Sequence, residues 1–217
     1  MPIFTENFQM SSKVTPYKDS SLGKKEQVTQ MFDNVSSNYD TLNRILTFGI
    51  DVGWRKKVVQ MVMDAQTKKV LDVATGTGDL AIMFGREATE EVVGLDISPG
   101  MLEIGKNKVS DKGLDKKVEM IIGDSEKMVF DDGTFDAVTV AFGVRNFEDL
   151  EKGLREILRV LRPGGMLVVL ETSHPEGAVV KQLFQIYSKY IIPNIGKLRS
   201  KEKKAYDYLP ESAAAFP

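Results

Sequence analysis

The chain has 217 residues, of which 42% are hydrophobic and 28% are charged. This length and balance are those of a single globular domain with a real core and an appendage. A formal net charge of -2 provides no overall positive field, so we expect no nucleic-acid partner. The absence of cysteine excludes disulfides, thiolate catalysis and cysteine-ligated metal or iron–sulfur sites, and we expect no metal.

No apolar run approaches the roughly 18 residues that a membrane-spanning helix needs. Residues 1–13 lack the basic and then apolar order of a secretory signal peptide. We therefore predict a cytoplasmic protein whose polar residues 1–22 form a mobile arm. A chain without cysteine fits a reducing compartment.

Helical periodicity begins after this arm. Apolar residues recur at helical spacing within residues 24–37, and we expect Asp51 to cap a second helix that runs to about residue 62. Between the two helices lie residues 39–43 and 46–50, which are aromatic and rich in turn-forming residues. These stretches predict a loop or a broken helix.

Five short apolar runs follow, at residues 70–74, 92–96, 118–122, 135–141 and 166–171. Nearly all their residues are apolar, as expected for strands buried on both faces of a parallel sheet. The stretches between them read as helices: Ser98 caps one before Pro99, and residues 150–161 carry a single apolar stripe. The alternation predicts a doubly wound α/β sheet with helices on both faces, followed by a last helix over about 177–192.

A glycine turn, Gly76-Thr77-Gly78, follows the first predicted strand directly. Small residues allow a sharp turn and a close approach to a ligand, at which the next helix would point its N-terminus. Asp96 ends the second strand, where a carboxylate can accept two hydrogen bonds from a ribose diol. Asp124 ends the third strand, where it or Ser125 can meet an adenine edge. The pattern predicts a nucleoside cofactor at the carboxyl edge of the sheet.

This pattern does not select one cofactor. Gly76, Gly78 and Ala81 with Asp96 also satisfy the dinucleotide fingerprint, so nicotinamide and flavin cofactors stay open, as does a glycine turn without a ligand. Asp72 favours S-adenosylmethionine, because an acidic group there suits a sulfonium or an amino group and would repel a pyrophosphate. In addition, only about 45 residues follow the fifth strand, too few for the separate catalytic domain of most dinucleotide enzymes.

The stretch from Leu71 to Asp79 resembles the first motif of class I methyltransferases. Narrower likenesses occur at three places: residues 39–43 with 48–50 and Trp54; residues 142–146; and residues 206–212 with 216–217. Together, over about Tyr17 to the last residue, they resemble the menaquinone/ubiquinone biosynthesis C-methyltransferases. The resemblance implies a Rossmann-like class I methyltransferase fold. It also implies methyl transfer from S-adenosylmethionine to a ring carbon of a prenylated quinol, and we favour demethylmenaquinol over the ubiquinone precursor.

Site residues follow from the motifs and the resemblance together. For the cofactor they are Asp72, Gly76, Thr77, Gly78, Asp96, Ile97, Met101, Asp124, Ser125 and Ala141. For the substrate they are Asn43, Phe142, Asn146 and Tyr206. Many members of the family have Ser where this chain has Ala141, which removes one hydrogen bond to the cofactor.

Methylation at carbon requires a ring hydroxyl to lose its proton. Arg145 is our candidate to stabilise the phenolate or hold a water, since a guanidinium is itself a poor base; the alternative is a structural, ion-pairing arginine. His174, the single histidine, has the pKa of a base, but it is also explained as a loop residue. Tyr39 is the third catalytic candidate. It closes over the substrate, as Tyr206 and Tyr208 would, or packs in the core.

We assign one methyltransferase domain, residues 1–217. It comprises the arm, a helical substrate cap (23–66), a cofactor-binding core (67–176) and a C-terminal helix and lid (177–217). The family continues past the lid with a helix and two strands. Because this chain stops at Pro217, we expect strands six and seven to be absent and the fifth strand to form an exposed edge.

Several alternatives stay open at this stage. The chain could be another small-molecule methyltransferase, a dinucleotide-dependent oxidoreductase or a binding module without catalysis. The basic residues between 197 and 204 suit peripheral docking at the inner face of the membrane, or they form a solvated lid surface. A homodimer is equally compatible with the sequence.

Overall fold

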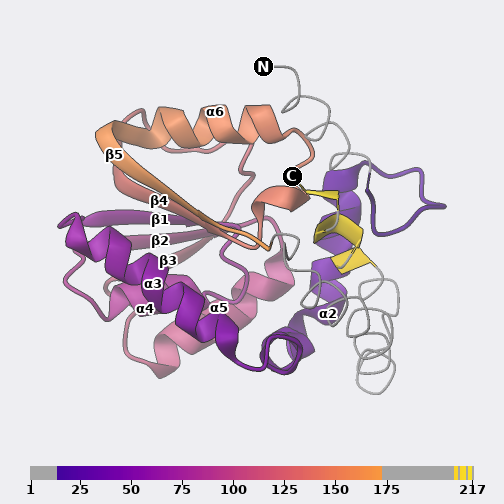
Figure 1. The fold of residues 1–217 in the computed structure, drawn as a ribbon, viewed down its shortest axis with the longest axis horizontal. Coiled ribbons are helices and arrows are strands. Elements are labelled where there is room, and N and C mark those ends of the chain that lie inside the picture. Colours follow the sequence, from indigo (N-terminus) through magenta and orange to yellow (C-terminus); the bar gives the residue numbers. More distant parts are fainter. Residues whose placement is uncertain (1–13, 173–207, 210, 214, 217) are drawn as a thin grey trace, which may run out of the picture.

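The computed structural model describes residues 14–172, 208–209, 211–213 and 215–216 (Figure 1). Within these residues five parallel strands form one sheet in the order β3-β2-β1-β4-β5. The strands are β1 (Lys69–Val73), β2 (Glu91–Asp96), β3 (Val118–Ile122), β4 (Phe135–Ala141) and β5 (Leu161–Leu170). The chain order reverses between β1 and β4, and in such sheets ligands bind beyond the carboxyl ends of the strands at this point.

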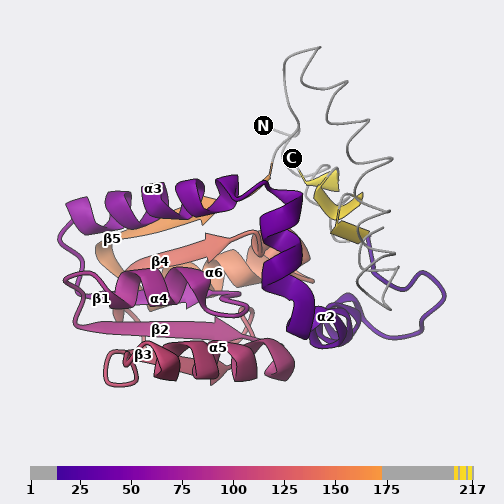
Figure 2. The same cartoon turned by 90° about the horizontal axis from the view of Figure 1, so that it is seen from below.

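Helices cover both faces of the sheet. They are α2 (Lys24–Leu46), α3 (Ile50–Asp64), α4 (Asp79–Gly85), α5 (Pro99–Asp111), α6 (Leu150–Val160) and the short 3-10 helix η1 (Val144–Asn146). Figure 2 shows α3, α4 and α5 on one face and α6 behind the sheet, while α2 stands across the carboxyl ends of the strands. None of the described helices is long and apolar enough to cross a membrane.

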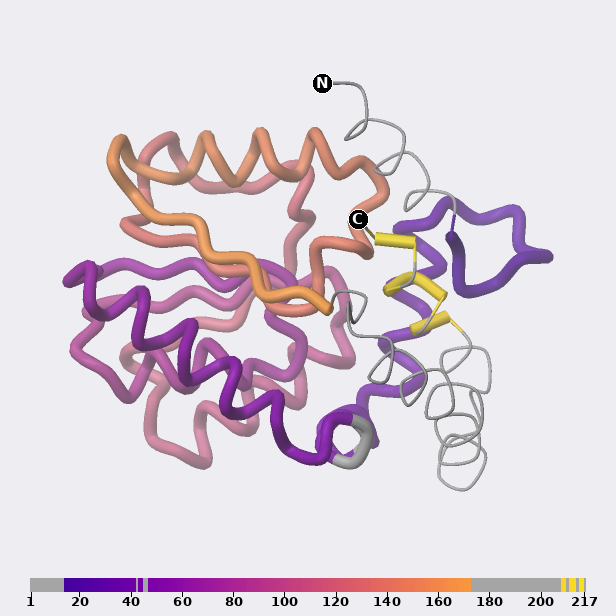
Figure 3. The backbone as a smooth tube through the Cα atoms, viewed as in Figure 1, coloured from indigo at the N-terminus to yellow at the C-terminus, as the bar shows by residue number. Residues whose placement is uncertain are grey.

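Alternate residues of the strands enter two separate cores. Val70 and Val92 pack with α3, α4 and α5, whereas their neighbours Leu71 and Val93 pack with Ile157 of α6. This two-residue period explains why the strands read as continuous apolar runs, because both of their faces are buried. A third cluster joins α2 to α5 and to the C-terminal residue Tyr208. The described C-terminal residues, drawn in yellow, lie beside α2 in the backbone trace (Figure 3).

The predicted doubly wound α/β fold is confirmed, and the bounds of the first four strands agree with the structure to within one residue. The region before them differs from the prediction. Residues 39–46 continue α2 instead of forming a loop, since they contain neither glycine nor proline, and the chain turns at residues 47–49. Gly49, with φ +74°, is the N-cap of α3. Asp51 lies in the first turn and makes no capping hydrogen bond; it binds Arg44 and Arg55 instead.

The fifth strand is also longer than predicted. It begins at Leu161, immediately after α6, and includes the Pro163-Gly164-Gly165 segment that the sequence places in a turn. A register shift opposite Phe135 and Ala137 accommodates this irregular stretch, with Gly164 at φ +78°. The helix predicted for residues 177–192 and the basic cluster at 197–204 lie outside the described residues.

Two helical glycines provide a matched test of this packing. A Cβ on Gly153 of α6 would lie 2.5 Å from the ring of buried Phe147, whereas a Cβ on Gly53 of α3 meets nothing within 4 Å. Overpacking typically costs about 1–3 kcal/mol, and Gly to Ala in an open helix gains about 0.5–1 kcal/mol. We therefore expect Gly153→Ala to lower the unfolding free energy and Gly53→Ala to raise it in urea denaturation. Equal effects of the two substitutions would contradict the packing described.

Candidate cofactor and substrate pocket

A pocket with about 710 Å³ of empty space, open solvent included, lies between α2 and the carboxyl ends of the strands. Helix α2 contributes one wall through Lys25, Val28, Phe32 and Tyr39. The segments after β1 to β4 contribute the others. The lining from these segments and α5 consists of Ala74, Gly76, Leu95, Asp96, Ile97, Met101, Gly123, Asp124, Ser125, Glu126, Ala141, Phe142, Gly143, Asn146, Phe147 and Glu148.

The backbone turns sharply where β1 and β4 end at this pocket. Ala74 has φ +54° and Phe142 has φ +59°, a region that side chains other than glycine rarely adopt. Gly76 lies at φ +59°, and a Cβ on Gly143 would lie 2.5 Å from that of Ala74. Strained residues of this kind gather at ligand sites, where the surrounding structure holds them in place.

Asp96 is held in the pocket by backbone hydrogen bonds. Its Oδ2 accepts from the Gly76 nitrogen at 2.7 Å and its Oδ1 accepts from the Ser98 nitrogen at 2.9 Å. Burial raises the pKa of this carboxyl above its ordinary value. Each oxygen has a second lone pair, so the carboxylate can still accept hydrogen bonds from a diol.

Asp124 has an unforeseen partner in Lys25 of α2. The lysine Nζ lies 2.8 Å from Asp124 Oδ2 and 2.8 Å from Glu126 Oε2. Burial alone would lower the pKa of Lys25, but its hydrogen bonds to these carboxylates outweigh burial and raise the pKa to about 12. The end of β3 is thereby joined to the start of α2. Sequence reasoning missed Lys25 and Glu126, because their pairing spans 101 residues.

Asp72 belongs to the interior rather than to the pocket lining. It is 1% exposed, and its two oxygens accept from the hydroxyls of Thr139 at 2.8 Å and Thr75 at 2.6 Å. Burial raises the pKa of Asp72 to about 6. Asp72 can therefore influence a ligand in this pocket only through its electrostatic field, and not through direct contact.

The raised pKa of Asp72 predicts a stability change with pH. The folded state binds this proton more tightly than the unfolded state, so the stabilisation is present below about pH 4 and disappears as the pH rises through about 6. Removing the titration by Asp72→Asn should make the unfolding free energy fall less between pH 4 and pH 7, by roughly 3 kcal/mol. Urea denaturation of both proteins across this range measures the difference. Parallel curves would show that Asp72 titrates normally.

Thr77 and Gly78 of the glycine turn also lie outside the lining. The Thr77 hydroxyl donates to Asp40 of α2 at 2.6 Å and accepts from Lys108 Nζ at 3.0 Å. Gly78 is the N-cap of α4 at φ +77°, where a Cβ would lie 2.9 Å from Met120 Cε. Only the first glycine of the turn, Gly76, therefore lines the pocket.

An aromatic group closes the other end of the pocket. Tyr39 lines it, and burial raises the pKa of this phenol, which hydrogen-bonds to the side chain of Asn43. Asn43 thus supports Tyr39 and is not itself part of the lining. Phe142 lies 6.2 Å from the Trp54 ring, with the Arg55 guanidinium 5.3 Å from its centroid.

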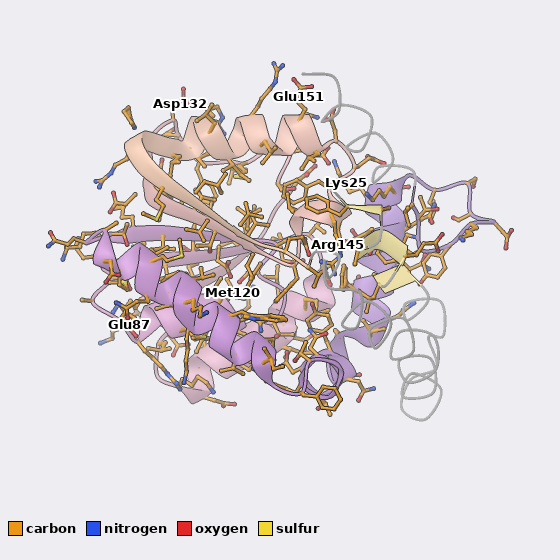
Figure 4. All side chains as sticks on the ribbon, in the orientation of Figure 1. Lys25, Glu87, Met120, Asp132, Arg145 and Glu151 are labelled. Carbon is orange, nitrogen blue, oxygen red and sulfur yellow. The ribbon has the colours of Figure 1, made fainter. Side chains whose placement is uncertain are left out.

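Arg145 is buried beside the pocket wall, in the polar cluster around η1 (Figure 4). Its Nε donates to Ser212 Oγ at 3.3 Å and its Nη1 donates to Glu171. The neighbouring Asn146 lines the pocket and accepts from the Tyr208 hydroxyl at 2.9 Å. Burial raises the pKa of Tyr208 to about 12.

This cluster brings two separate motifs together, residues 142–146 and the C-terminal residues Tyr208 and Ser212. Lys24 adds a further bond, from its Nζ to the Arg145 carbonyl at 2.9 Å. His174 and Tyr206, which we predict to act on the substrate, lie outside the described residues. Within the described ranges, no group of three or more acidic or histidine side chains is arranged to hold a metal ion.

Comparison with known proteins agrees with this architecture. Residues 20–217 match the ubiE/COQ5 methyltransferase family. A demethylmenaquinone methyltransferase of Bacteroides fragilis is 49% identical over 207 residues, which cover 94% of this chain and 84% of that protein. A ubiquinone/menaquinone biosynthesis C-methyltransferase UbiE of Geobacter sulfurreducens is 42% identical, over 94% of this chain and 80% of that protein.

A solved structure shows the same fold. The YcgJ protein of Bacillus subtilis superposes with a TM-score of 0.51 at 28% identity, over 60% of this chain and 56% of that chain. The sequence match spans nearly all of the chain, including the glycine turn, the segment after β4 and the C-terminal motif. The chain belongs to the ubiE/COQ5 methyltransferase family and is a methyltransferase.

Proposed function

We propose that this enzyme transfers the methyl group of S-adenosylmethionine to a ring carbon of demethylmenaquinol, forming menaquinol. The single observation that carries the proposal is the match along nearly the whole chain to the demethylmenaquinone methyltransferase of Bacteroides fragilis. The relative from Geobacter sulfurreducens bears a name that covers ubiquinone biosynthesis as well, so the ubiquinone precursor is the second candidate.

The residues of the pocket fit the methyl donor. Asp96 presents a carboxylate, held by two backbone nitrogens, to ribose hydroxyls, and Gly76 leaves room for a close approach. Asp124 and Ser125 line the region where an adenine edge would lie. The carboxylates at the strand ends disfavour a pyrophosphate, because the one described cation in the lining, Lys25, is already paired with two of them. This charge pattern argues against a dinucleotide.

The cofactor supplies an electrophilic methyl on a sulfonium, and this chain supplies position. We infer that Phe142 and Tyr39 flank the quinol ring, since both line the pocket near Arg55 and Arg145. Holding the ring carbon in line with the methyl can contribute several kcal/mol to lowering the barrier. Burial outweighs the charges of Arg145 and Arg55, which act to lower the pKa of the Tyr39 phenol. Arg145 would act in the same direction on a bound phenol, from beside the pocket, where it is bound to Glu171.

One test of the proposed function concerns binding of the methyl donor. Removing the Asp96 carboxylate by Asp96→Ala should weaken S-adenosylmethionine binding by about 10-fold to 100-fold, because hydrogen bonds to a charged group contribute roughly 1.5–3 kcal/mol. Isothermal calorimetry measures the affinity, and Asp115→Ala, at an exposed position outside the lining, is the control. Unchanged affinity in Asp96→Ala would remove Asp96 from the cofactor site.

A further test of the proposed function concerns the methyl-transfer reaction. Incubation with methyl-labelled S-adenosylmethionine should transfer label to demethylmenaquinol faster than to the ubiquinone precursor or to simple phenols. Product analysis by mass spectrometry locates the methyl group on carbon. Faster labelling of the ubiquinone precursor would reassign the substrate. Tight binding of a nicotinamide dinucleotide, with no label transfer to any phenol, would refute the proposal.

A further inference from the structure

Glu171 has a buried carboxylate in which one oxygen accepts hydrogen bonds and the other has no hydrogen-bond partner. It follows β5 directly, and its side chain is 6% exposed. Oε1 accepts from Arg145 Nη1, from the Thr172 nitrogen at 3.0 Å and from the Thr172 hydroxyl at 3.4 Å. Oε2 is buried and has no hydrogen-bond partner; among the described side chains it is the one buried polar atom in this state.

A buried carboxylate oxygen without a hydrogen-bond partner destabilises the folded protein. Desolvating an acceptor without a hydrogen bond costs free energy, and more so for a charged group. Such an atom in a native structure calls for an explanation, such as an ordered water, an ion or a catalytic role.

The position of Glu171 indicates where a donor to Oε2 would come from. β5 pairs with β4, and the Phe142 nitrogen donates to the Leu170 carbonyl at 2.7 Å. Ala141 and Phe142 line the pocket, so Glu171 lies one residue beyond the strand that borders this wall. Glu171 is not part of the lining itself. A ring hydroxyl packed against Phe142 would therefore reach Glu171 only by displacing this wall or through one bridging water.

We propose that Glu171 Oε2 receives the hydroxyl proton of the quinol, directly or through one bridging water, with Arg145 as the positioning residue that holds Oε1. This inference rests on the proposed function, because the proton is that of a quinol hydroxyl. Arg145 keeps its charge near neutral pH and is a poor proton acceptor. Glu171 would therefore supply the proton acceptor, beside the role that we predict for Arg145 of stabilising the phenolate or holding a water.

The step balances in atoms and electrons. The O–H bond breaks, its proton passes to Glu171, and its electron pair raises the electron density of the neighbouring ring carbon. That carbon forms a bond to the methyl group as the sulfur–methyl bond breaks, and the electron pair of that bond stays on sulfur. The ring carbon then loses its hydrogen as a proton, the oxygen regains a proton, and the aromatic ring is restored. One proton is released overall.

The test compares the wild type with Glu171→Gln, which keeps an oxygen acceptor for Arg145 but cannot take a proton. Loss of a general base typically lowers kcat about 100-fold to 10,000-fold, so we expect such a loss with unchanged affinity for S-adenosylmethionine. Glu156→Gln is the matched control, because Glu156 pairs with Arg159 on α6, outside the pocket lining. It should keep wild-type kcat, and thermal melts report folding in all three proteins.

Two further readouts separate a base from a structural ion pair. The variant rate should rise about tenfold per pH unit between pH 7 and 9, where the wild-type rate stays flat, because ionisation of the quinol in solution replaces the missing base. Among the described residues, Arg145 and Tyr208 are the charged and titratable groups that face Glu171. Without cofactor, the wild type should bind 1-naphthol more tightly than 1-methoxynaphthalene, and Glu171→Gln should lose most of this preference.

The outcomes are distinct. If Glu171→Gln keeps its kcat within threefold of the wild type, or loses kcat equally at every pH, the proposed role of Glu171 is wrong. In that case methylation of the quinol by the wild type would still support the proposed function. A variant that melts much earlier is replaced by Glu171→Asp, for which partial activity supports the proposal and full activity refutes it. A wild type that methylates no quinol would refute both proposals.

Discussion

The placement of α2 across the carboxyl ends of the strands is the constraint on which the pocket depends. The helix is bonded to the core at several points along its length. Lys25 pairs with Asp124 and Glu126 after β3, and Asp33 accepts from the Ser98 hydroxyl at 2.5 Å and from the Gly100 nitrogen at 2.9 Å. Further along, the anchoring residues of α2 are Asp40, bonded to Thr77 and Lys108, and Arg44, bonded to Asp51 and Asp79. Without these bonds the pocket would lose one wall.

This anchoring divides the glycine-turn motif into two parts. Gly76 faces the pocket and donates to Asp96, so the start of the motif positions a ligand. Thr77 and Asp79 are part of the polar network that fixes α2 and α5 against α4. The same short segment therefore shapes the cofactor site and secures the helix above it. A substitution at Thr77 would act on cofactor binding mainly through the position of α2.

Much of the fold could be predicted from the sequence, because strands buried on both faces leave continuous apolar runs and glycine turns mark their ends. The pocket residues Gly76, Asp96 and Asp124 followed from those strand ends, whereas Phe142 followed from the family resemblance; all four line the pocket. The continuation of α2 past residue 38 did not follow, since tertiary bonds of its polar residues override the turn-like local composition.

The side chains that sequence reasoning missed are those whose roles arise from distant partners. Lys25 reads locally as a solvated helix residue, but it pairs with carboxylates about 100 residues away. Glu171 reads as the end of a strand, and only the fold reveals that one of its oxygens is buried without a partner. Arg145, our candidate to stabilise the phenolate or hold a water, lies beside the pocket lining and pairs with Glu171. No local pattern in the chain encodes these contacts.

A crystal structure of the protein with S-adenosylhomocysteine is the most direct measurement of the central claim, that the space beneath α2 is the cofactor site. The account predicts the nucleoside between α2 and the strand ends, with its ribose hydroxyls within hydrogen-bonding distance of the Asp96 carboxylate. A nucleoside bound elsewhere on the protein, or bound here without contact to Asp96, would contradict it.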